Sequence, residues 1–184
     1  GDANSQTISI TVIGDRLVEP DETFQVVLGN ASAGSDIKVG SATGTIVSDD
    51  VHWDIGVTAT PVEGDSGATG YQFLVTRTGS GLATTLAWSV AGTGANPASA
   101  DDFFGGQLPF GDLTFADGQM SQTITVWVAG DNQLEPDEGF TVSLQASSDS
   151  LSHTFANQQV SAVIRNDDDV FAIAPRAADG VEGT

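Results

Sequence analysis

The stretch "SQTITVWVAGD", Ser121 to Asp131, decides the fold class of this 184-residue chain. Its apolar residues Ile124, Val126 and Val128 recur at every second position, and β-branched and aromatic types dominate. Because successive side chains of a strand point to opposite faces, this period of two places one face against a core and the other toward solvent. The stretch therefore predicts a half-buried β-strand that ends at a Gly-Asp turn.

The same period of two continues through residues 51–168, where no window has a convincing helical period. Turns rich in Gly, Asp, Asn and Pro separate the apolar runs. Seven strands are expected, near residues 52–60, 70–77, 84–91, 111–115, 121–129, 139–146 and 158–165. Seven short strands in about 118 residues are typical of an immunoglobulin-like antiparallel β-sandwich, so the chain is predicted to be all-β.

The opening stretch has a second copy, "SQTISITVIGD", which lies 116 residues earlier at Ser5 to Asp15. The similarity continues into an acidic "EPDE" stretch, and the offset then becomes 118 residues. We interpret the chain as tandem repeats: the C-terminal half of one repeat in residues 1–50, a complete repeat in 51–168 and the start of a further repeat in 169–184. The alternation of Ile8, Ile10 and Val12 predicts a strand in the partial repeat as well.

The partial repeats contain too few strands to close a sandwich. Apolar side chains would then lie open beside unpaired strand edges, among them Ile8, Ile10, Phe24, Val26 and Leu28. We expect these flanks to be ordered only when neighbouring chain segments complete them, either from a longer polypeptide or from another copy.

The composition is strongly acidic, with 25 Asp and Glu against five Lys and Arg and a formal charge of −20. Nucleic acids and anionic membranes are therefore disfavoured as partners, and cations are favoured. The absence of cysteine excludes disulfides and thiolate chemistry. No apolar run reaches the length of a membrane span, so any signal or anchor is expected outside these residues.

In a sandwich whose strands alternate in direction, every second connection lies at the same end. The connections after the first, third and fifth expected strands, and the residues after the seventh, contain these acids: Glu63, Asp101 and Asp102, Asp131 to Glu138, and Asp167 to Asp169. Carboxylates gathered at one pole repel one another unless a cation lies among them. Oxygen-only ligands favour calcium over zinc and copper, and flexible loops favour it over magnesium. The alternative is a solvated acidic end that keeps the protein soluble.

Six short stretches, taken in order, resemble the Calx-β domain family: "VEGD" (62–65), "VTRTG" (75–79), "ADDFFGG" (100–106), "LTFADGQMSQTITVWVAGD" (113–131), "EPDEGFTVSL" (135–144) and "VIRNDDD" (163–169). The family includes domains of sodium/calcium exchangers and of large bacterial surface proteins. The resemblance implies a seven-stranded β-sandwich that binds calcium at the acidic pole.

The resemblance also implies the ligands. In the complete repeat they are Glu63, Asp102, Asp131, Glu135, Glu138, Asp167 and Asp168. In the partial repeat the matching residues are Asp15, Glu19, Glu22, Asp49 and Asp50, and Glu182 would open the third repeat. Asn132 and Asn166 stand where the family often has acids, so one or two ions per pole are expected, at affinities nearer extracellular than cytosolic calcium concentrations.

These inferences predict a calcium-binding structural or adhesive repeat module of a large extracellular or cell-surface protein, with a bacterial source expected. The junctions "DDV" (49–51) and "DDDV" (167–170) leave almost no linker, so calcium is expected to stiffen the joints between repeats. The expected partners are calcium and neighbouring repeats or another copy of the chain.

Two other functions were weighed against this one. The first is an adhesin module that binds a cell-surface or glycan receptor through the loops after the second and sixth strands, or through Trp53, with calcium incidental or absent. The second is an enzyme, since paired carboxylates also serve glycosidases. Trp88 and Trp127 lie inside expected strands, where core or sheet-face packing is favoured over sugar stacking. The chain contains no recognisable nucleophilic triad, phosphate loop or nucleotide fingerprint, so it is not expected to be an enzyme.

Overall fold

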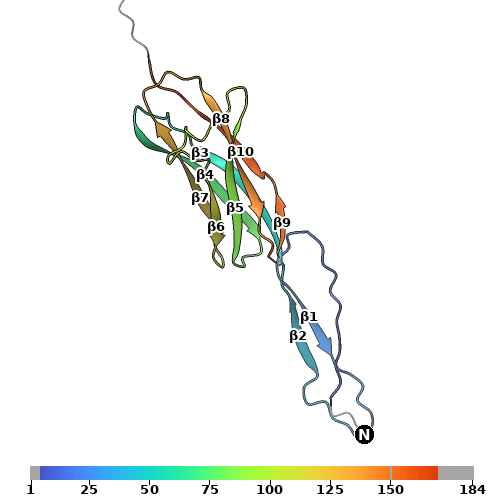
Figure 1. Cartoon of the computed structure of the whole chain (residues 1–184). Helices are drawn as coiled ribbons and strands as arrows, with labels where there is room; N and C mark the ends of the chain where they lie inside the picture. Colours follow the sequence, from blue (N-terminus) through green and yellow to red (C-terminus); the bar gives the residue numbers. More distant parts are fainter. Residues whose placement is uncertain (1–4, 150, 170–184) are drawn as a thin grey trace, which may run out of the picture.

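The computed structural model describes residues 5–149 and 151–169, and their regular structure is entirely β (Figure 1). Two four-stranded sheets pack into a β-sandwich, with the strand orders β10, β8, β5, β6 and β7, β4, β3, β9, and β1 and β2 form a separate hairpin. The strands are β1 (Glu22–Val27), β2 (Ser41–Ile46), β3 (Asp50–Ala59), β4 (Gly67–Gly79), β5 (Thr84–Thr93), β6 (Phe110–Phe115), β7 (Ser121–Gly130), β8 (Glu138–Ala146), β9 (Ser152–Phe155) and β10 (Gln159–Ile164). Within these described residues, no helix is long and apolar enough to span a bilayer.

The predicted all-β sandwich is confirmed, because the seven expected strands correspond to β3 to β8 and β10. Alternate residues face inward as the period of two requires: in β7, Ile124, Val126 and Val128 are buried, whereas Trp127 is 52% exposed. The inward-facing residues of both sheets form one hydrophobic core.

Phe140 lies in this core and is fully buried, as expected from its place in β8. Its ring makes edge-to-face contacts with Tyr71 and Phe73 of β4 and with Phe103 of the β5–β6 connection, at centroid distances of 5.8, 6.0 and 5.5 Å. One aromatic side chain therefore joins the two sheets to the β5–β6 connection.

Strand β9 lies in a segment that the alternation did not distinguish from a loop. It pairs in parallel with β3, from Asp50↔Ser152 to Trp53↔Phe155, and the chain then continues into β10, which pairs with β8 in the other sheet. The last strand of the sandwich therefore switches sheets partway along its length. All four residues of β9 are half-buried, so no period of two marks them in the sequence.

Side-chain hydrogen bonds hold β9 against β3. Trp53 is fully buried, and its Nε1–H donates to Nδ1 of His153 at 2.9 Å. The hydroxyl of Thr154 donates to the carbonyl oxygen of Val51 at 3.1 Å. The burial of Trp53 does not support the alternative in which this side chain contacts an external ligand.

The hairpin of β1 and β2 has the register of β8 and β10 in the sandwich. Glu22 pairs with Ile46, and Glu138, 116 residues after Glu22, pairs with Ile164, 118 residues after Ile46. Both hairpins also contain the same closing bond, from the N–H of Leu28 to the carbonyl of Gly40 at 2.7 Å and, at the matching positions, from Leu144 to Gln158 at 2.8 Å.

The strand expected at residues 8–13 is not formed, which corrects that prediction. Ile8 is 58% and Ile13 91% exposed, and no strand includes them. The physical reason lies in the pairing of the matching strand β7, whose residues 121–130 are all held by β4. The described residues ahead of residue 8 supply no counterpart of β4, whereas β1 and β2 hold each other. Alternation alone therefore does not make a strand where the pairing partner is missing.

The partial repeat contacts the complete one at the start of β3. Gly79 has a φ of 95°, and a Cβ there would overlap the carbonyl oxygen of Asp50 and come within 2.8 Å of Cγ1 of Val18. The N–H of Ser80 donates to the same Asp50 carbonyl at 2.8 Å. Glycine therefore lets the acidic loop that contains Val18 lie against the turn that follows β4.

Candidate metal site

Four segments far apart in sequence meet at one end of the sandwich, as predicted. They are the β3–β4 connection (60–66), the β5–β6 connection (94–109), the β7–β8 connection (131–137) and residues 165–169 after β10, and we call them the acidic pole. The N–H of Glu63 donates to the carbonyl of Arg165 at 3.3 Å, and the N–H of Ala129 donates to that of Asp102 at 3.0 Å. Backbone bonds thus fix these segments beside one another.

Asp102, Glu135 and Glu138 form the centre of the acidic pole. One carboxylate oxygen from each lies within 4.8 Å of the other two, and no other group of three acidic or histidine side chains in the described residues comes as close. Burial, and then a hydrogen bond with the carboxyl of Asp102, raise the pKa of Glu138 to about 7. Burial and the neighbouring Asp131 also raise the pKa of Glu135. This crowding is the electrostatic signature of carboxylates that lack a countercharge.

Glu63 borders this centre from the β3–β4 connection and is only 6% exposed. Burial, and then repulsion from the carboxylates of Asp131 and Glu135, raise the pKa of Glu63 to about 7. The hydroxyl of Thr69 donates to the carbonyl of Glu63 at 2.5 Å and fixes the backbone of the connection at this point.

The remaining predicted ligands of the complete repeat flank the centre. Asp131 accepts the N–H of Gln133 at 2.7 Å, and Asp167 accepts the N–H of Gly64 at 3.0 Å. Asp168 has a buried Oδ2 without a hydrogen-bond partner. All seven residues therefore lie at one pole, and one of them presents an orphaned oxygen.

Asn132 and Asn166, which stand where the family often has acids, link the segments of the acidic pole by hydrogen bonds. Their sequence context did not suggest this role. Asn132 donates its Nδ2–H to the carbonyl of Asp65 at 3.0 Å. Asn166 donates its Nδ2–H to the carbonyl of Gln133 at 2.8 Å and to Oε1 of Glu63 at 3.4 Å. These bonds need a donor, which an amide supplies and a carboxylate at the same position would not.

The five predicted ligands of the partial repeat also gather in one place. They line a single depression of about 370 Å³ and are Asp15, Glu19, Glu22, Asp49 and Asp50. Asp50 is only 6% exposed, and its Oδ1 is buried without a partner. Asp50 precedes Asp168 by 118 residues, so the same position carries an orphaned carboxylate oxygen twice.

Two further hydrogen bonds recur between the acidic loops. Asp15 accepts the N–H of Leu17 at 2.8 Å, as Asp131 accepts that of Gln133. Oδ1 of Asp21 accepts the N–H of Ser48 at 3.0 Å, and at the matching positions Oδ1 of Asp137 accepts that of Asn166 at 3.3 Å. The acidic loop of the partial repeat thus has the local geometry of its complete counterpart. Glu182 lies outside the described residues.

These carboxylates have no basic partner in the part of the chain that the structure describes. No Lys or Arg side chain there forms an ion pair, and the recorded pair joins Asp149 to His153. Arg77 is buried, but its guanidinium donates to carbonyl oxygens, including those of Gln119 at 2.6 Å and Leu82 at 2.5 Å. A hard cation with oxygen ligands fits this donor set and its orphaned oxygens, and calcium accepts the loop-based geometry best.

The sequence model of the Calx-beta domain family matches the chain twice, at residues 1–51 and 48–169. Among curated proteins, the adhesion G-protein coupled receptor V1 of Danio rerio is 32% identical over 150 residues, which are 77% of this chain and 2% of the receptor. The expectation of a bacterial source is not borne out by this relative.

Solved structures similar to the chain include two of calcium-binding domains. The calcium-binding domain CBD12 of CALX1.1 has 23% identity and a TM-score of 0.46 over 54% of this chain and 40% of that one. The apo form of the Calx CBD1 domain has 19% identity and a TM-score of 0.46 over 63% of this chain and 98% of that one. The chain thus spans a small part of the receptor and less than half of CBD12. Because the two matches of the family's sequence model together span most of its length, the chain belongs to the Calx-beta domain family.

Proposed function

We propose that the chain is a calcium-binding module of tandem Calx-beta repeats and that calcium stiffens the joint between them. The observation that carries the proposal is the orphaned carboxylate oxygen at Asp50 and at Asp168, each beside a cluster of acids. Desolvating a carboxylate without a partner is costly, and a divalent cation offsets that cost.

In the complete repeat, Asp102, Glu135 and Glu138 would hold one ion, because their oxygens already converge. Glu63, Asp131, Asp167 and Asp168 border that position and would supply the remaining oxygens or hold a second ion. In the partial repeat, the acids that line the depression would hold the ion at the joint itself.

The stiffening follows from where the second site lies. Asp50 belongs to the acids of the partial repeat and is also the first residue of β3. Val18, in the same acidic loop, lies against Gly79 of the complete repeat. An ion held by this loop and by Asp49 and Asp50 would fix the first repeat against the second, whereas unneutralised acids there repel one another.

A calcium titration by calorimetry on EDTA-treated protein tests the binding. We expect saturable heat, and a melting temperature that rises with calcium by mass action, equivalent to about 2.7 kcal/mol at a hundredfold excess over the dissociation constant. Magnesium should do distinctly less, because it keeps its waters and demands octahedral geometry. An unchanged melt in millimolar calcium would rule out the proposal.

The joint is tested separately by distance measurements between two spin labels. The chain has no cysteine, so the exposed Lys38 and Ser89 can be replaced by cysteine as unique labelling sites in the two repeats. Calcium should narrow the distribution of distances between the two labels, relative to the protein in EDTA. Glu19→Gln with Glu22→Gln should abolish the narrowing, whereas Glu135→Gln with Glu138→Gln should leave it, because only the first pair lies at the joint. Equal narrowing in both variants would refute stiffening while leaving calcium binding intact.

We also propose that the chain belongs to an extracellular or cell-surface protein and that its repeats divide at residues 50 and 168. The similarity to an adhesion receptor supports the location, and the repeated hairpin register supports the division. On this proposal the chain binds calcium, connects neighbouring repeats and catalyses no reaction.

A further inference from the structure

An aromatic groove of about 360 Å³ lies on the side of the sandwich, beside the part of the β5–β6 connection that follows Asp102. It runs between β6 and β7, the edge strands of the two sheets, and the β5–β6 connection closes one side. Its principal lining residues are Trp88, Phe104, Gln107, Leu108, Phe110 and Trp127. Phe110 is 76%, Phe104 65% and Trp127 52% exposed, so large apolar rings face solvent here.

The connection presents Phe104 in a fixed position. The preceding Phe103 is fully buried in the core, and the N–H of Phe104 donates to the carbonyl of Trp127 at 2.9 Å. Gly105 and Gly106, with φ of 97° and 65°, then turn the chain, and the N–H of Gly106 donates to the carbonyl of Phe103 at 2.9 Å. The exposed ring is therefore anchored by the residues on either side of it.

Each indole lies against a glycine on the neighbouring strand. Trp88 pairs with Gly111, and Trp127 pairs with Gly70. A Cβ on Gly111 would come within 3.1 Å of Trp88, and one on Gly70 within 3.2 Å of Trp127. A side chain at either glycine would push the ring away, so both glycines let the indoles settle against the strands.

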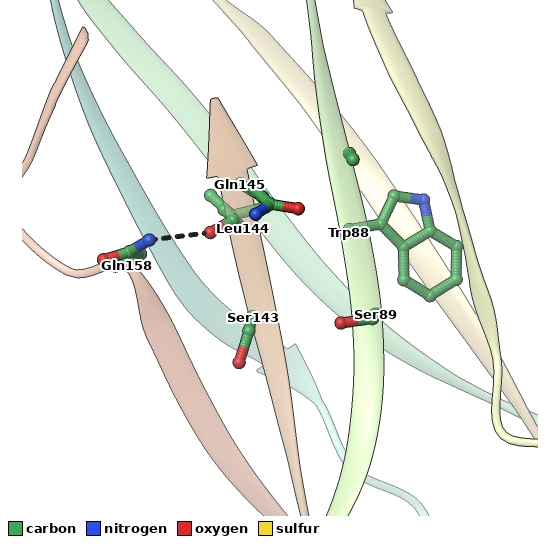
Figure 2. Close-up of a pocket in the computed structure, with 7 residues that line it drawn as sticks. Trp88, Ser89, Ser143, Leu144, Gln145 and Gln158 are labelled. Atoms are coloured by element: carbon green, nitrogen blue, oxygen red, sulfur yellow. Dashed lines mark hydrogen bonds between the residues drawn. The ribbon is translucent and has the colours of Figure 1, made fainter. Parts of the chain in front are cut away.

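Trp88 lines this groove and also borders a second, more polar depression between β5 and β8. Figure 2 shows the indole extending from β5 away from Leu144 and Gln158, which line that second depression with Ser143 and Gln145. Gln158 there donates its amide to the carbonyl of Leu144 at 3.1 Å, as the dashed line in Figure 2 marks.

The groove is uncharged although the chain carries 25 acids. None of the described residues that line it is Asp, Glu, Lys, Arg or His. An uncharged lining offers no counterion to a charged ligand, which disfavours ionic partners. A second copy of the chain is disfavoured too, because each copy has a formal charge of −20.

From this geometry we infer that the groove binds a neutral oligosaccharide. The C–H faces of sugar rings pack against aromatic rings, and their hydroxyls need neutral donors and acceptors at the rim. The amide of Gln107 and the hydroxyl of Thr125 line the groove and form no hydrogen bond to other described residues, so both are free for a ligand. None of the acidic pole's seven carboxylates lines the groove, so sugar binding should not require calcium.

The test is titration of the full chain with neutral oligosaccharides, namely cellohexaose, laminarihexaose, mannohexaose and chitohexaose. The indole N–H signals of Trp88 and Trp127 are followed by NMR, in EDTA and in calcium. We expect at least one sugar to shift these two signals but not that of the buried Trp53, equally in both buffers. Trp127→Ala and Phe104→Ala should each weaken binding about tenfold or more, or about 1.4 kcal/mol.

Leu134→Ala is the matched control, since Leu134 is a 62% exposed apolar residue at the acidic pole. It should leave sugar binding unchanged. Absence of any shift with all four sugars at millimolar concentration overturns the inference. So does sugar binding that survives both groove variants. Concentration-dependent dimerisation that Trp127→Ala abolishes, without sugar binding, would instead assign the groove to chain association and would also overturn it.

Discussion

The indole Nε1–H of Trp53 donates to Nδ1 of His153 at 2.9 Å, and this bond selects the tautomer of the imidazole. Because Nδ1 accepts, the ring hydrogen lies on Nε2, which donates to Oδ1 of Asp149 at 2.8 Å. Although partial burial opposes it, hydrogen bonds from Thr84 and His153 hold the pKa of Asp149 well below its usual range. A buried tryptophan, a histidine and an aspartate thus join β3, β9 and the turn before β9.

Replacing His153 with alanine should therefore destabilise the sandwich. It leaves the buried indole N–H without a partner, which costs about 1 to 3 kcal/mol. Urea unfolding in EDTA and in calcium should give the same loss in both, because neither Trp53 nor His153 is a candidate ligand. His52→Ala is the control. Among the described residues, the imidazole of His52 hydrogen-bonds only to the hydroxyl of Thr154, so this variant should lose less stability. Equal losses in the two variants would contradict the role assigned to the Trp53 bond.

The acidic pole predicts an unusual pH dependence for the metal-free protein. The pKa values of Glu63 and Glu138 are about 7, above the ordinary 4.5, so the folded state holds protons that the unfolded chain releases. The stability that these groups contribute is complete below about pH 4.5 and is lost as the pH rises through about 7. Unfolding in EDTA should therefore show lower stability at about pH 8 than at about pH 5.

Calcium should reverse this trend, because only deprotonated carboxylates bind the ion. Its affinity should rise with pH through the same range, and calorimetry at several pH values measures this directly. Metal-free stability that increased from pH 5 to pH 8 would mean that the carboxylates are compensated in some other way.

Glu135→Gln and Asp168→Asn should each weaken calcium binding and leave the metal-free fold nearly intact. Removing one charge from a repelling cluster relieves the repulsion, so the metal-free variants should melt at or slightly above the temperature of the parent. Asp112→Asn, a change of an exposed acid on β6, is the matched control and should alter neither property. A loss of several kcal/mol in EDTA for Glu135→Gln or Asp168→Asn would show that the acid has a structural role instead.

Phe140→Ala should cost about 3 to 5 kcal/mol whether or not calcium is present, because it opens a cavity between three aromatic rings. Chemical unfolding measures the loss. A cost that depended strongly on calcium would imply that the core and the acidic pole are coupled.

Hydrogen exchange on the 184-residue chain at low concentration should divide it into regions of different protection. Residues 8–13 should exchange fast, because they form no strand. β1 and β2 should be less protected than β3 to β8, because their hairpin lies outside the hydrophobic core that β3 to β8 share. Protection of residues 8–13 equal to that of β7 would show that a partner completes the partial repeat in solution.

The period of two was sufficient to predict the sandwich and its acidic pole. In β7 and β8 one face is buried and the other is more exposed. The alternation of Ile124, Val126 and Val128 is therefore enough to predict the fold class. The same rule produced a wrong strand at residues 8–13 and missed β9. A strand requires a neighbour as well as a pattern, and β9, the part of the last strand before it switches sheets, is half-buried at every position and has no pattern.

The acids of the candidate site were also predictable, since loop positions follow from strand direction. The roles of Asn132 and Asn166 were not, because a missing charge in sequence says nothing about which carbonyl an amide reaches in space. Hydrogen bonds between segments about 30 to over 60 residues apart, such as that from Asn166 to Gln133, depend on the tertiary fold.

The parallel pairing of β3 and β9 has a mechanical consequence. The chain enters the sandwich at Asp50, where β3 begins, and leaves after β10, which continues the direction of β9. A force that pulls the two ends apart therefore slides β3 and β9 past each other in opposite directions. The bonds from Asp50↔Ser152 to Trp53↔Phe155 lie across that direction, so they must rupture together and cannot unzip one by one. Within a string of such repeats under tension, this short pair would set the force at which a repeat begins to unravel.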